Sequence, residues 1–350
     1  MNGLDFSGLD LGAWEAFWQS LAAGGPFSGG LRELMAQLGD GSLLADPAAL
    51  MDWLGEAALA YFKRGFGAYA ALIALAVVCA VLGILTDGGQ GIGAAAGFLC
   101  FGMGAALVSY QLTALISMTR ETIAKLSSFM ELSAPVLAVA LAASGATATG
   151  AGISPLTAFL LSAVTGAFKS VVLPLATACA VCAVLSLITD KGRLEHMFSL
   201  LKSAIKWISG AVFTVYFGAV AVQGLTVART DGIALRTAKY TLDKSVPIIG
   251  GAMSGTLETV LGSAALVKNT VGVAALVTIA LIAAAPMLTI ACSGLAARAV
   301  AAVCEPLGES KLPALLGKAS DVCNALFAVL TAVIMMFMIT VGLVLAAANP

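Results

Sequence analysis

The chain has 350 residues, of which 60% are hydrophobic and only 11% are charged. A soluble domain carries about 25% charged residues, so this composition excludes water as the main solvent for most of the chain. The net charge is −1, and the basic residues lie scattered at segment ends instead of forming a stripe, which argues against a nucleic-acid partner. We therefore predict an all-α, polytopic integral membrane protein whose main surroundings are the lipid bilayer.

Residues 1–64 differ from the rest of the chain in charge and pattern. Up to Glu56 they carry eight acidic residues against one base, Arg32, whereas the remainder of the chain is basic. Trp14 and Trp18 recur at helical spacing, and glycines interrupt the pattern. We predict an acidic amphipathic extramembrane head that lies on the membrane surface, docks on a partner or is loosely ordered. Its first residues lack the basic and apolar pattern of a signal peptide, so none is recognised.

Residues 65–350 form the predicted transmembrane domain, because they contain apolar stretches of about 20 residues that are long enough to cross roughly 30 Å of hydrocarbon. We expect seven to nine transmembrane helices, beginning with Phe66–Thr86 and Ile92–Met118 and ending with Val322–Ala348. A charged amphipathic stretch at 120–131 follows the second span. Further apolar segments are expected at 132–148, 208–227 and 246–265. Basic residues flank the spans on both sides, so the orientation stays open.

Two other apolar segments are too long for one straight crossing. The first runs from 154 to 188, about 52 Å as a single helix, and contains Lys169 and Pro174. The second runs from 271 to 303 and contains Pro286. Each is either two short spans or one broken helix, and hydropathy does not choose between these alternatives.

The chain also repeats itself. The decapeptide VCAVLGILTD at Val78–Asp87 returns as VCAVLSLITD at Val181–Asp190, with three differences. A third, partial copy aligns LLGKASDVCNALFAVL from Leu315 with LLKSAIKWISGAVFTV from Leu200. We predict related units of about 110 residues at about 66–150, 154–265 and 270–350. Such repeats are typical of transporters and channel scaffolds, in which sites form between the repeats.

The cysteines and the single histidine do not indicate a chemical site. All seven cysteines lie in or beside apolar runs, so we interpret them as small buried hydrophobic residues and not as a disulfide framework. Cys179 and Cys182 form a CxxC pair, but there is no second pair and only His196 besides, so no metal and no cofactor is predicted. The motifs of hydrolases and metalloproteases are also missing, so no catalytic residue is predicted and an enzymatic function is disfavoured.

Ionisable residues within apolar stretches are the candidates for a functional role. A charge near the middle of the bilayer costs about 2.5 to 3.5 kcal/mol on insertion scales, so it normally faces inward or finds a partner. Glu258 and Lys268 would pair across a hairpin at an intervening Gly-Ser turn, or each would reach the interface by its own length. The prolines permit either gating breaks or plain kinks. The candidate pathway or packing residues are Lys169, Glu258, Lys268, Asn269, Arg298, Pro174, Pro247, Pro286, Pro306, Gly308 and Glu309.

Two late segments carry a recognisable pattern: GSAALVKNTVGVAALV from Gly262 and CEPLGESKLPALLGKASDVCNALFAVL from Cys304. With ALRTAKYTLDKSVPIIGGAMSGTLETVLGSA from Ala234, they resemble the stage III sporulation protein AE family of endospore-forming bacteria. The pattern Leu-Val-Lys-Asn followed by Gly, and Pro-Leu-Gly followed by an acid, match Leu266, Val267, Lys268, Asn269, Gly272, Pro306, Leu307, Gly308 and Glu309. The resemblance covers about 60–350 in architecture and is most specific over 230–330.

This resemblance implies a component of the sporulation channel complex encoded by the stage III A operon, in the mother-cell membrane that surrounds the forespore. The implied partners are the other stage III A proteins and the stage II Q protein of the forespore. The complex would resemble a secretion apparatus and support late forespore development. A homo-oligomer is compatible with this interpretation, and no catalytic residues are implied.

The repeats and broken helices also fit a second hypothesis, an autonomous secondary transporter of a small solute. The two hypotheses differ in one observable property. A transporter works when purified alone in liposomes, whereas a channel component needs the products of the neighbouring genes.

Overall fold

The computed structural model describes residues 12–22, 30–33, 35, 47–85, 92–143, 159–188, 193–245, 250–307 and 311–346. No strand occurs among these residues, which confirms the predicted all-α class. The main helices are α1 (Gly12–Ala22), α3 (Pro47–Leu85), α4 (Ile92–Ala143), α6 (Leu173–Ile188), α7 (Arg193–Ser245), α8 (Gly250–Cys304) and α9 (Lys311–Ala346). Residues 159–167 are α-helical and lead through a π-helical turn, Phe168–Val172, into α6. A 3-10 turn, Glu305–Leu307, follows α8.

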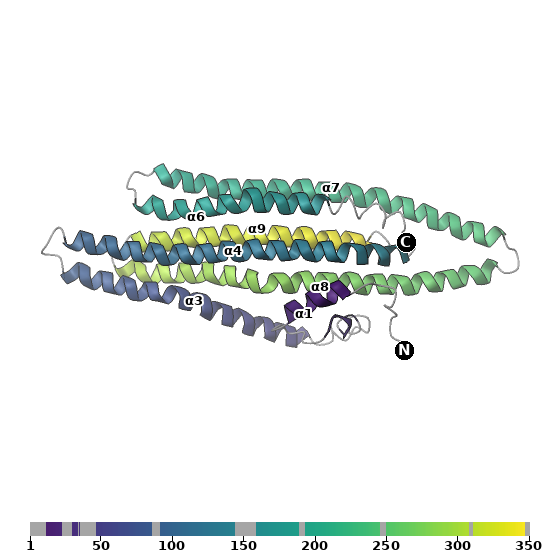
Figure 1. The fold of residues 1–350 in the computed structure, drawn as a ribbon, viewed down its shortest axis with the longest axis horizontal. Helices are drawn as coiled ribbons and strands as arrows, with labels where there is room; N and C mark the ends of the chain where they lie inside the picture. The colour runs from purple at the N-terminus through teal and green to yellow at the C-terminus, as the bar shows by residue number, and fades with distance from the viewer. Residues whose placement is uncertain are drawn as a thin grey trace.

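The helices pair into three antiparallel hairpins: α3 with α4, α6 with α7, and α8 with α9 (Figure 1). In each pair the first helix ends, and the second begins, at the same end of the molecule, which we call the turn end. Each predicted repeat unit contains the turn of one hairpin, although the boundary predicted between 265 and 270 falls inside α8. Helices α7 and α8 also extend together beyond the other helices at the opposite end (Figure 1).

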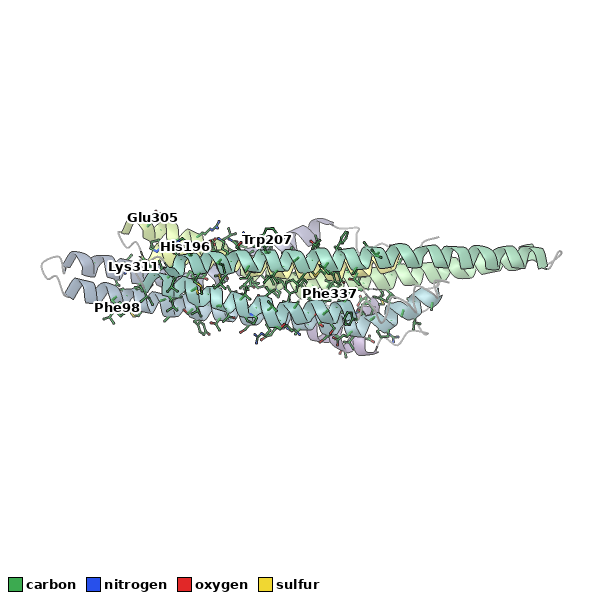
Figure 2. All side chains as sticks on the ribbon, turned by 90° about the horizontal axis from the view of Figure 1, so that it is seen from above. Phe98, His196, Trp207, Glu305, Lys311 and Phe337 are labelled. Carbon is green, nitrogen blue, oxygen red and sulfur yellow. The ribbon has the colours of Figure 1, made fainter. Side chains whose placement is uncertain are left out.

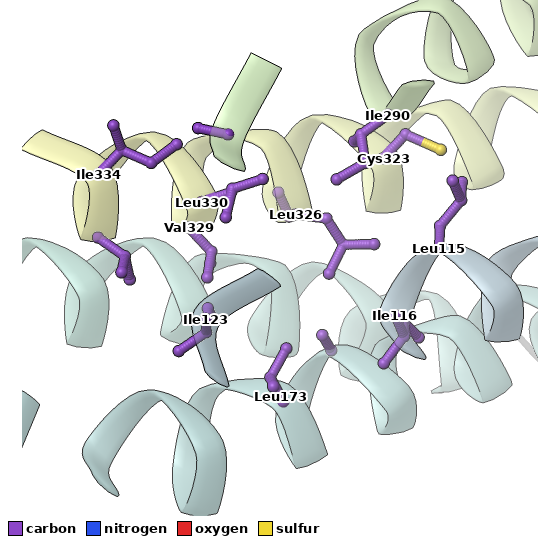
Figure 3. Packing of buried hydrophobic residues seen from close by; sticks show 14 of the residues in the cluster. Leu115, Ile116, Ile123, Leu173, Ile290, Cys323, Leu326, Val329, Leu330 and Ile334 are labelled. Atoms are coloured by element: carbon purple, nitrogen blue, oxygen red, sulfur yellow. The ribbon is translucent and has the colours of Figure 1, made fainter. Parts of the chain in front are cut away.

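Helix α9 lies at the centre of the bundle and packs against α8, α7, α4 and α6. Figure 3 shows Leu326 and Leu330 of α9 among buried side chains that include Ile123 of α4 and Leu173 of α6. The approach to α8 depends on Gly294, because a Cβ there would lie 3.1 Å from Cys323 Cβ. Small residues allow such close packing of helix backbones, which is the usual basis of helix association in membranes.

Six helices among the described residues are long and apolar enough to cross a membrane, fewer than the seven to nine expected. They are Leu59–Val78, Gly97–Ala140, Phe159–Ile188, Leu194–Val222, Asn269–Cys304 and Lys311–Gly342. One reason is that α4 continues through the charged stretch that was expected to separate two spans, and another is that the segment expected at 246–265 lies outside the part of the chain whose side chains are described. Arg120 and Lys125 lie on the exposed face of α4, while Ile123 and Leu126 continue its buried face, so nothing ends the helix there.

The two over-long apolar segments are helices without a second crossing. In the first, Leu173 N–H donates to Phe168 O across the π-helical turn, directly before Pro174. A proline lacks the backbone donor that its helix position requires, and a π turn is one way in which a helix accommodates this loss. In the second, Pro286 lies inside the continuous helix α8. The broken-helix alternative therefore describes the first segment, and neither segment folds back into two spans.

Part of the acidic head packs on the bundle. Trp14 and Trp18 of α1 are almost fully buried, and the rings of Trp14 and Phe17 lie 5.5 and 5.6 Å from the ring of Phe129 of α4. Helix α1 therefore packs on its own chain, which is none of the three arrangements predicted for the head. Helix α3 runs without interruption through residue 64, where the domain boundary is predicted.

The cysteines follow the prediction in part. Cys179, Cys182, Cys292, Cys304 and Cys323 are free and buried, as expected for small hydrophobic residues. Cys100, in contrast, is disulfide-bonded, so the interpretation of every cysteine as a free hydrophobic residue is wrong for this position. Pairing depends on the distance between two Cα atoms in space, which spacing along the sequence does not reveal. The side chain of Cys79 lies outside the described residues.

Candidate functional site

A network of charged side chains joins α6, α7, α8 and α9 near the turn end. Its most buried member is Lys318 of α9, whose side chain is only 11% exposed. Lys318 Nζ donates to Ser186 Oγ of α6 at 2.7 Å and pairs closely with the Glu195 carboxylate of α7. It also lies 5.6 Å from the centre of the Phe198 ring, a favourable position for a cation. One lysine thus contacts two neighbouring helices through three different groups.

Asp321 lies one turn beyond Lys318 and connects two further cations. Asp321 Oδ2 accepts a hydrogen bond from Lys202 Nζ of α7 at 2.7 Å, and Oδ1 lies 3.6 Å from Arg298 Nη2 of α8. The network contains three cations and two carboxylates. Because Lys318 is nearly enclosed whereas Arg298 is 60% exposed, the network extends from the bundle interior to its surface.

Helix periodicity explains why these side chains meet. Lys318 and Asp321 are three residues apart and therefore share one face of α9, and Glu195 and Lys202 are seven apart and share one face of α7. The α9 face packs on the α7 face, so each acid meets a base on the opposite helix. Ser186 and Arg298 complete the network because both lie within the last two turns of their helices.

The network fixes how the four helices lie relative to one another. A buried charge that loses its partner destabilises a protein by about 3 to 5 kcal/mol, whereas replacing a whole pair by apolar residues is often neutral. Sliding α9 along α7 by one turn would separate both cross-helix pairs at once. The pairs therefore specify the register of α7 and α9 more than they add to the stability of the bundle. Among the described residues no group of three or more His, Cys, Asp or Glu side chains is placed to hold a metal ion.

The predicted candidates are not gathered at one place. Arg298 belongs to the network, whereas Lys169 is half-buried in the π-helical turn and Asn269 is exposed in the first half of α8, far from Arg298. Pro174 opens α6, Pro286 is half-buried within α8, and Pro306 is exposed in the 3-10 turn. Pro247, Gly308 and Glu309 lie outside the described residues.

Glu258 and Lys268 do not lie on two arms of a hairpin. Helix α8 is continuous from Gly250 to Cys304, so the Gly-Ser turn that such a pair requires is absent from this helix. Ten residues of helix separate the two positions by about 15 Å. Their side chains are outside the described part of the structure, so their suggested role in a pathway stays a prediction.

The sequence interpretation missed Glu195, Lys318 and Asp321 as a site. A signal was present, because the segments from Leu200 and Leu315 were aligned with each other as repeats. In the structure these two segments lie on α7 and α9 and contribute Lys202, Lys318 and Asp321 to the network. Opposite charges three residues apart in an otherwise apolar helix are a second signal.

Comparison with known proteins identifies one family. The sequence model of the stage III sporulation protein AE family matches residues 30–348. The stage III sporulation protein AE of Bacillus subtilis (strain 168) is 29% identical over 234 residues. This alignment covers 67% of the chain and 59% of the relative, so the chain matches less than two thirds of that protein's length. No solved structure matches the chain.

Proposed function

Because the chain belongs to the stage III sporulation protein AE family, we propose that it is a membrane component of a sporulation-specific channel complex linking mother cell and forespore. In this proposal the protein resides in the mother-cell membrane around the forespore. Its work is structural, through helix packing and contacts with other subunits, and it is required for late forespore development.

The family match over residues 30–348 is the observation that carries this proposal. Two features of the structure support it. Within the described part of the chain, six helices are long and apolar enough to cross a membrane, as a channel subunit requires. The charged groups near the turn end pair with one another across four helices, an arrangement that holds a scaffold in register.

The proposed partners are the other proteins of the stage III A operon and the stage II Q protein of the forespore. Assembly with them would enclose faces of the bundle that a single chain leaves exposed. A subunit of this kind is expected to co-purify with its partners from sporulating cells and to lose that association when the bundle is distorted.

Deletion and complementation in a spore-forming host test the proposal. The gene is removed, and a reporter of late forespore gene expression is followed after engulfment. We expect expression to stop in the deletion strain and to return with the unchanged gene. The variant Glu305→Ala, which alters an exposed acid outside the network, is expected to complement fully. Normal forespore expression in the deletion strain would overturn the proposal.

An autonomous transporter of a small solute is the second candidate. The π-helical turn beside Pro174 and the proline inside α8 favour it, since interrupted helices often line transport pathways. Flux through liposomes that contain only the purified chain would support this candidate. Flux that appears only with the operon partners present would support the channel complex instead.

A further inference from the structure

One face of α4 is polar over a length comparable to the thickness of a membrane. From Thr113 to Glu131 its exposed positions bear hydroxyl groups, charges or alanine, and no large apolar side chain is fully exposed there. This stretch contains 19 residues, and its ends lie about 27 Å apart at 1.5 Å per residue. The exposed polar face, which we call the α4 polar face, consists of Thr113, Ser117, Arg120, Glu121, Lys125, Ser128 and Glu131.

Contacts between helices place this face at a definite position along the long axis of the bundle, which we call its height. A Cβ on Gly104 of α4 would lie 2.6 Å from Leu312 Cδ1, so these two residues are level. Helices α4 and α9 run in the same direction (Figure 1), and Ser128 and Met336 each lie 24 residues further along. Tyr216 OH of α7 is 3.4 Å from Met336 O. Ser128, near the end of the α4 polar face, is therefore level with Tyr216, and the middle of the face lies about 9 Å closer to the turn end.

At that same height the outer side of α7 is apolar. No charged residue occurs from Trp207 to Val222, and Val215 is 71% exposed. Trp207, next to Lys206, lies on the outer side of α7 (Figure 2), and tryptophan is typical of the boundary between hydrocarbon and water. Helix α9 likewise carries no charge after Asp321. On the side of α7 and α9, this height of the bundle is thus the part that the bilayer encloses, whereas α1 packs on α4 at the same height through Phe129.

The α4 polar face cannot therefore lie against lipid. Each arginine, lysine or acid at the centre of a bilayer costs about 2.5 to 3.5 kcal/mol on insertion scales, and this face carries four of them. Arg120, Glu121 and Lys125 form no ion pair with another described residue, and Glu131 accepts only a weak hydrogen bond from Ser127 at 3.3 Å. We propose that the α4 polar face lines a water-filled conduit between this chain and its neighbours in the complex.

The composition of the face favours contact with water over contact with a tightly packed protein surface. Its two bases and two acids sum to zero charge, and water solvates such a mixture without a matching pattern of charges on a partner. The hydroxyl groups add donors and acceptors that water satisfies equally well. A conduit lined in this way would not select strongly for ions of either sign. This inference rests on the proposed function, because a single chain supplies only one wall.

Thiol labelling tests the inference directly. Single variants Ser117→Cys and Ser128→Cys are made in the whole chain and expressed in a spore-forming host with its partners. Opened membrane vesicles are treated with a charged, membrane-impermeant methanethiosulfonate. Thr214→Cys is the matched control, because Thr214 is also exposed and lies two residues from Tyr216 on the apolar side of α7. The unchanged chain gives the background, because the five free cysteines among its described side chains are buried.

We expect Ser117→Cys and Ser128→Cys to react about tenfold faster than Thr214→Cys, since the reactive thiolate requires water. Equal reaction of Thr214→Cys would place the bilayer at another height and overturn the inference. Failure of both α4 variants to react would show that protein or lipid covers the face, with the same consequence. Sporulation of the same strains is scored separately, so loss of the channel role and loss of the conduit role are distinguishable.

Discussion

The α3–α4 and α6–α7 hairpins carry the same repeated decapeptide but hold it at different heights. In both, the helix ends after the eighth residue of the repeat, at Leu85 and Ile188. The first residues of the two copies, Val78 and Val181, are also similarly exposed, at 53% and 51%. The local structure of the repeat is thus the same in both hairpins.

The placement of the two hairpins along α9 is not the same. Gly104, the thirteenth residue of α4, is level with Leu312, the second residue of α9, so α4 begins about 16 Å before α9. Glu195, the third residue of α7, meets Lys318, the eighth of α9, so α7 begins about 8 Å after α9. The tip of α3–α4 therefore projects beyond the others (Figure 1). The repeat specifies a hairpin, and contacts outside the repeat specify its height.

The largest effect is expected from breaking the charged contact that positions α6–α7. Glu195→Ala leaves Lys318 buried with only Ser186 and the Phe198 ring, and we expect it to destabilise the bundle by about 2 to 3 kcal/mol. This value is below that of a fully buried pair because the Glu195 side chain is 56% exposed. Chemical unfolding of the purified chain in detergent measures the change.

The double variant Glu195→Ala with Lys318→Met removes the stranded charge and keeps the volume. We expect it to recover most of the lost stability, since replacing a buried pair by apolar residues is often neutral. Glu305→Ala is the matched control, because Glu305 is an exposed acid at the same end of the bundle. If the double variant is as unstable as the single one, the cost does not come from an unpaired lysine.

The height of α3–α4 depends on a contact without charge, and a larger residue at Gly104 is expected to disturb it. A Cβ added there would lie 2.6 Å from Leu312 Cδ1 and 3.7 Å from Leu72 Cδ2. Gly104→Val is therefore expected to cost about 1 to 3 kcal/mol by overpacking. Gly102→Val is the control, because a Cβ at Gly102 meets nothing within 4 Å. Equal unfolding midpoints for the two variants would show that the Leu312 side chain moves aside without a measurable cost in stability.

A smaller effect is expected where α7 meets α9 far from the turn end. Tyr216 OH is buried against Thr340 Oγ1, which itself donates to Met336 O at 2.8 Å. Tyr216→Phe removes one hydrogen bond but leaves Thr340 with a partner, so we expect a loss of about 1 kcal/mol. Tyr110→Phe, at an exposed tyrosine of α4, should leave the unfolding midpoint unchanged. A loss as large as that of Glu195→Ala would mean that Tyr216 also sets the register.

The sequence predicts the hairpins better than their arrangement. Hydropathy and the decapeptide identify the apolar helices and their repetition, because both depend on residues close in the chain. They did not predict that α4 continues past Arg120, since a charged stretch looks like a break until its opposite face is seen to be buried. They also could not give the height of α3–α4, which depends on Gly104 meeting Leu312 more than 200 residues later.

The site was predictable to a smaller degree. Arg298 was identified because a charge in an apolar helix is costly wherever it lies. Lys318 and Asp321 looked like ordinary polar residues at a segment boundary, and only the packing of α9 on α7 makes Lys318 a buried cation. The partner of a buried charge lies on another helix, and no periodicity within one helix reveals it.

The smallest effect is expected from Arg298, although it was the network member that the sequence singled out. Its guanidinium lies 3.6 Å from Asp321 Oδ1 and is 60% exposed, while Asp321 keeps Lys202 at 2.7 Å on its other oxygen. Arg298→Ala should therefore cost less than about 1 kcal/mol, as exposed ion pairs do, and the difference should shrink further at high salt. Lys202→Ala, which removes the closer cation, is the comparison variant and should cost more. Arg298→Ala could instead prove the more damaging of the two in chemical unfolding at both salt concentrations. In that case α8 would depend on the charged network for its position along the bundle, as α7 does. Charged contacts would then position both α6–α7 and α8–α9, and only α3–α4 would be positioned by an uncharged contact.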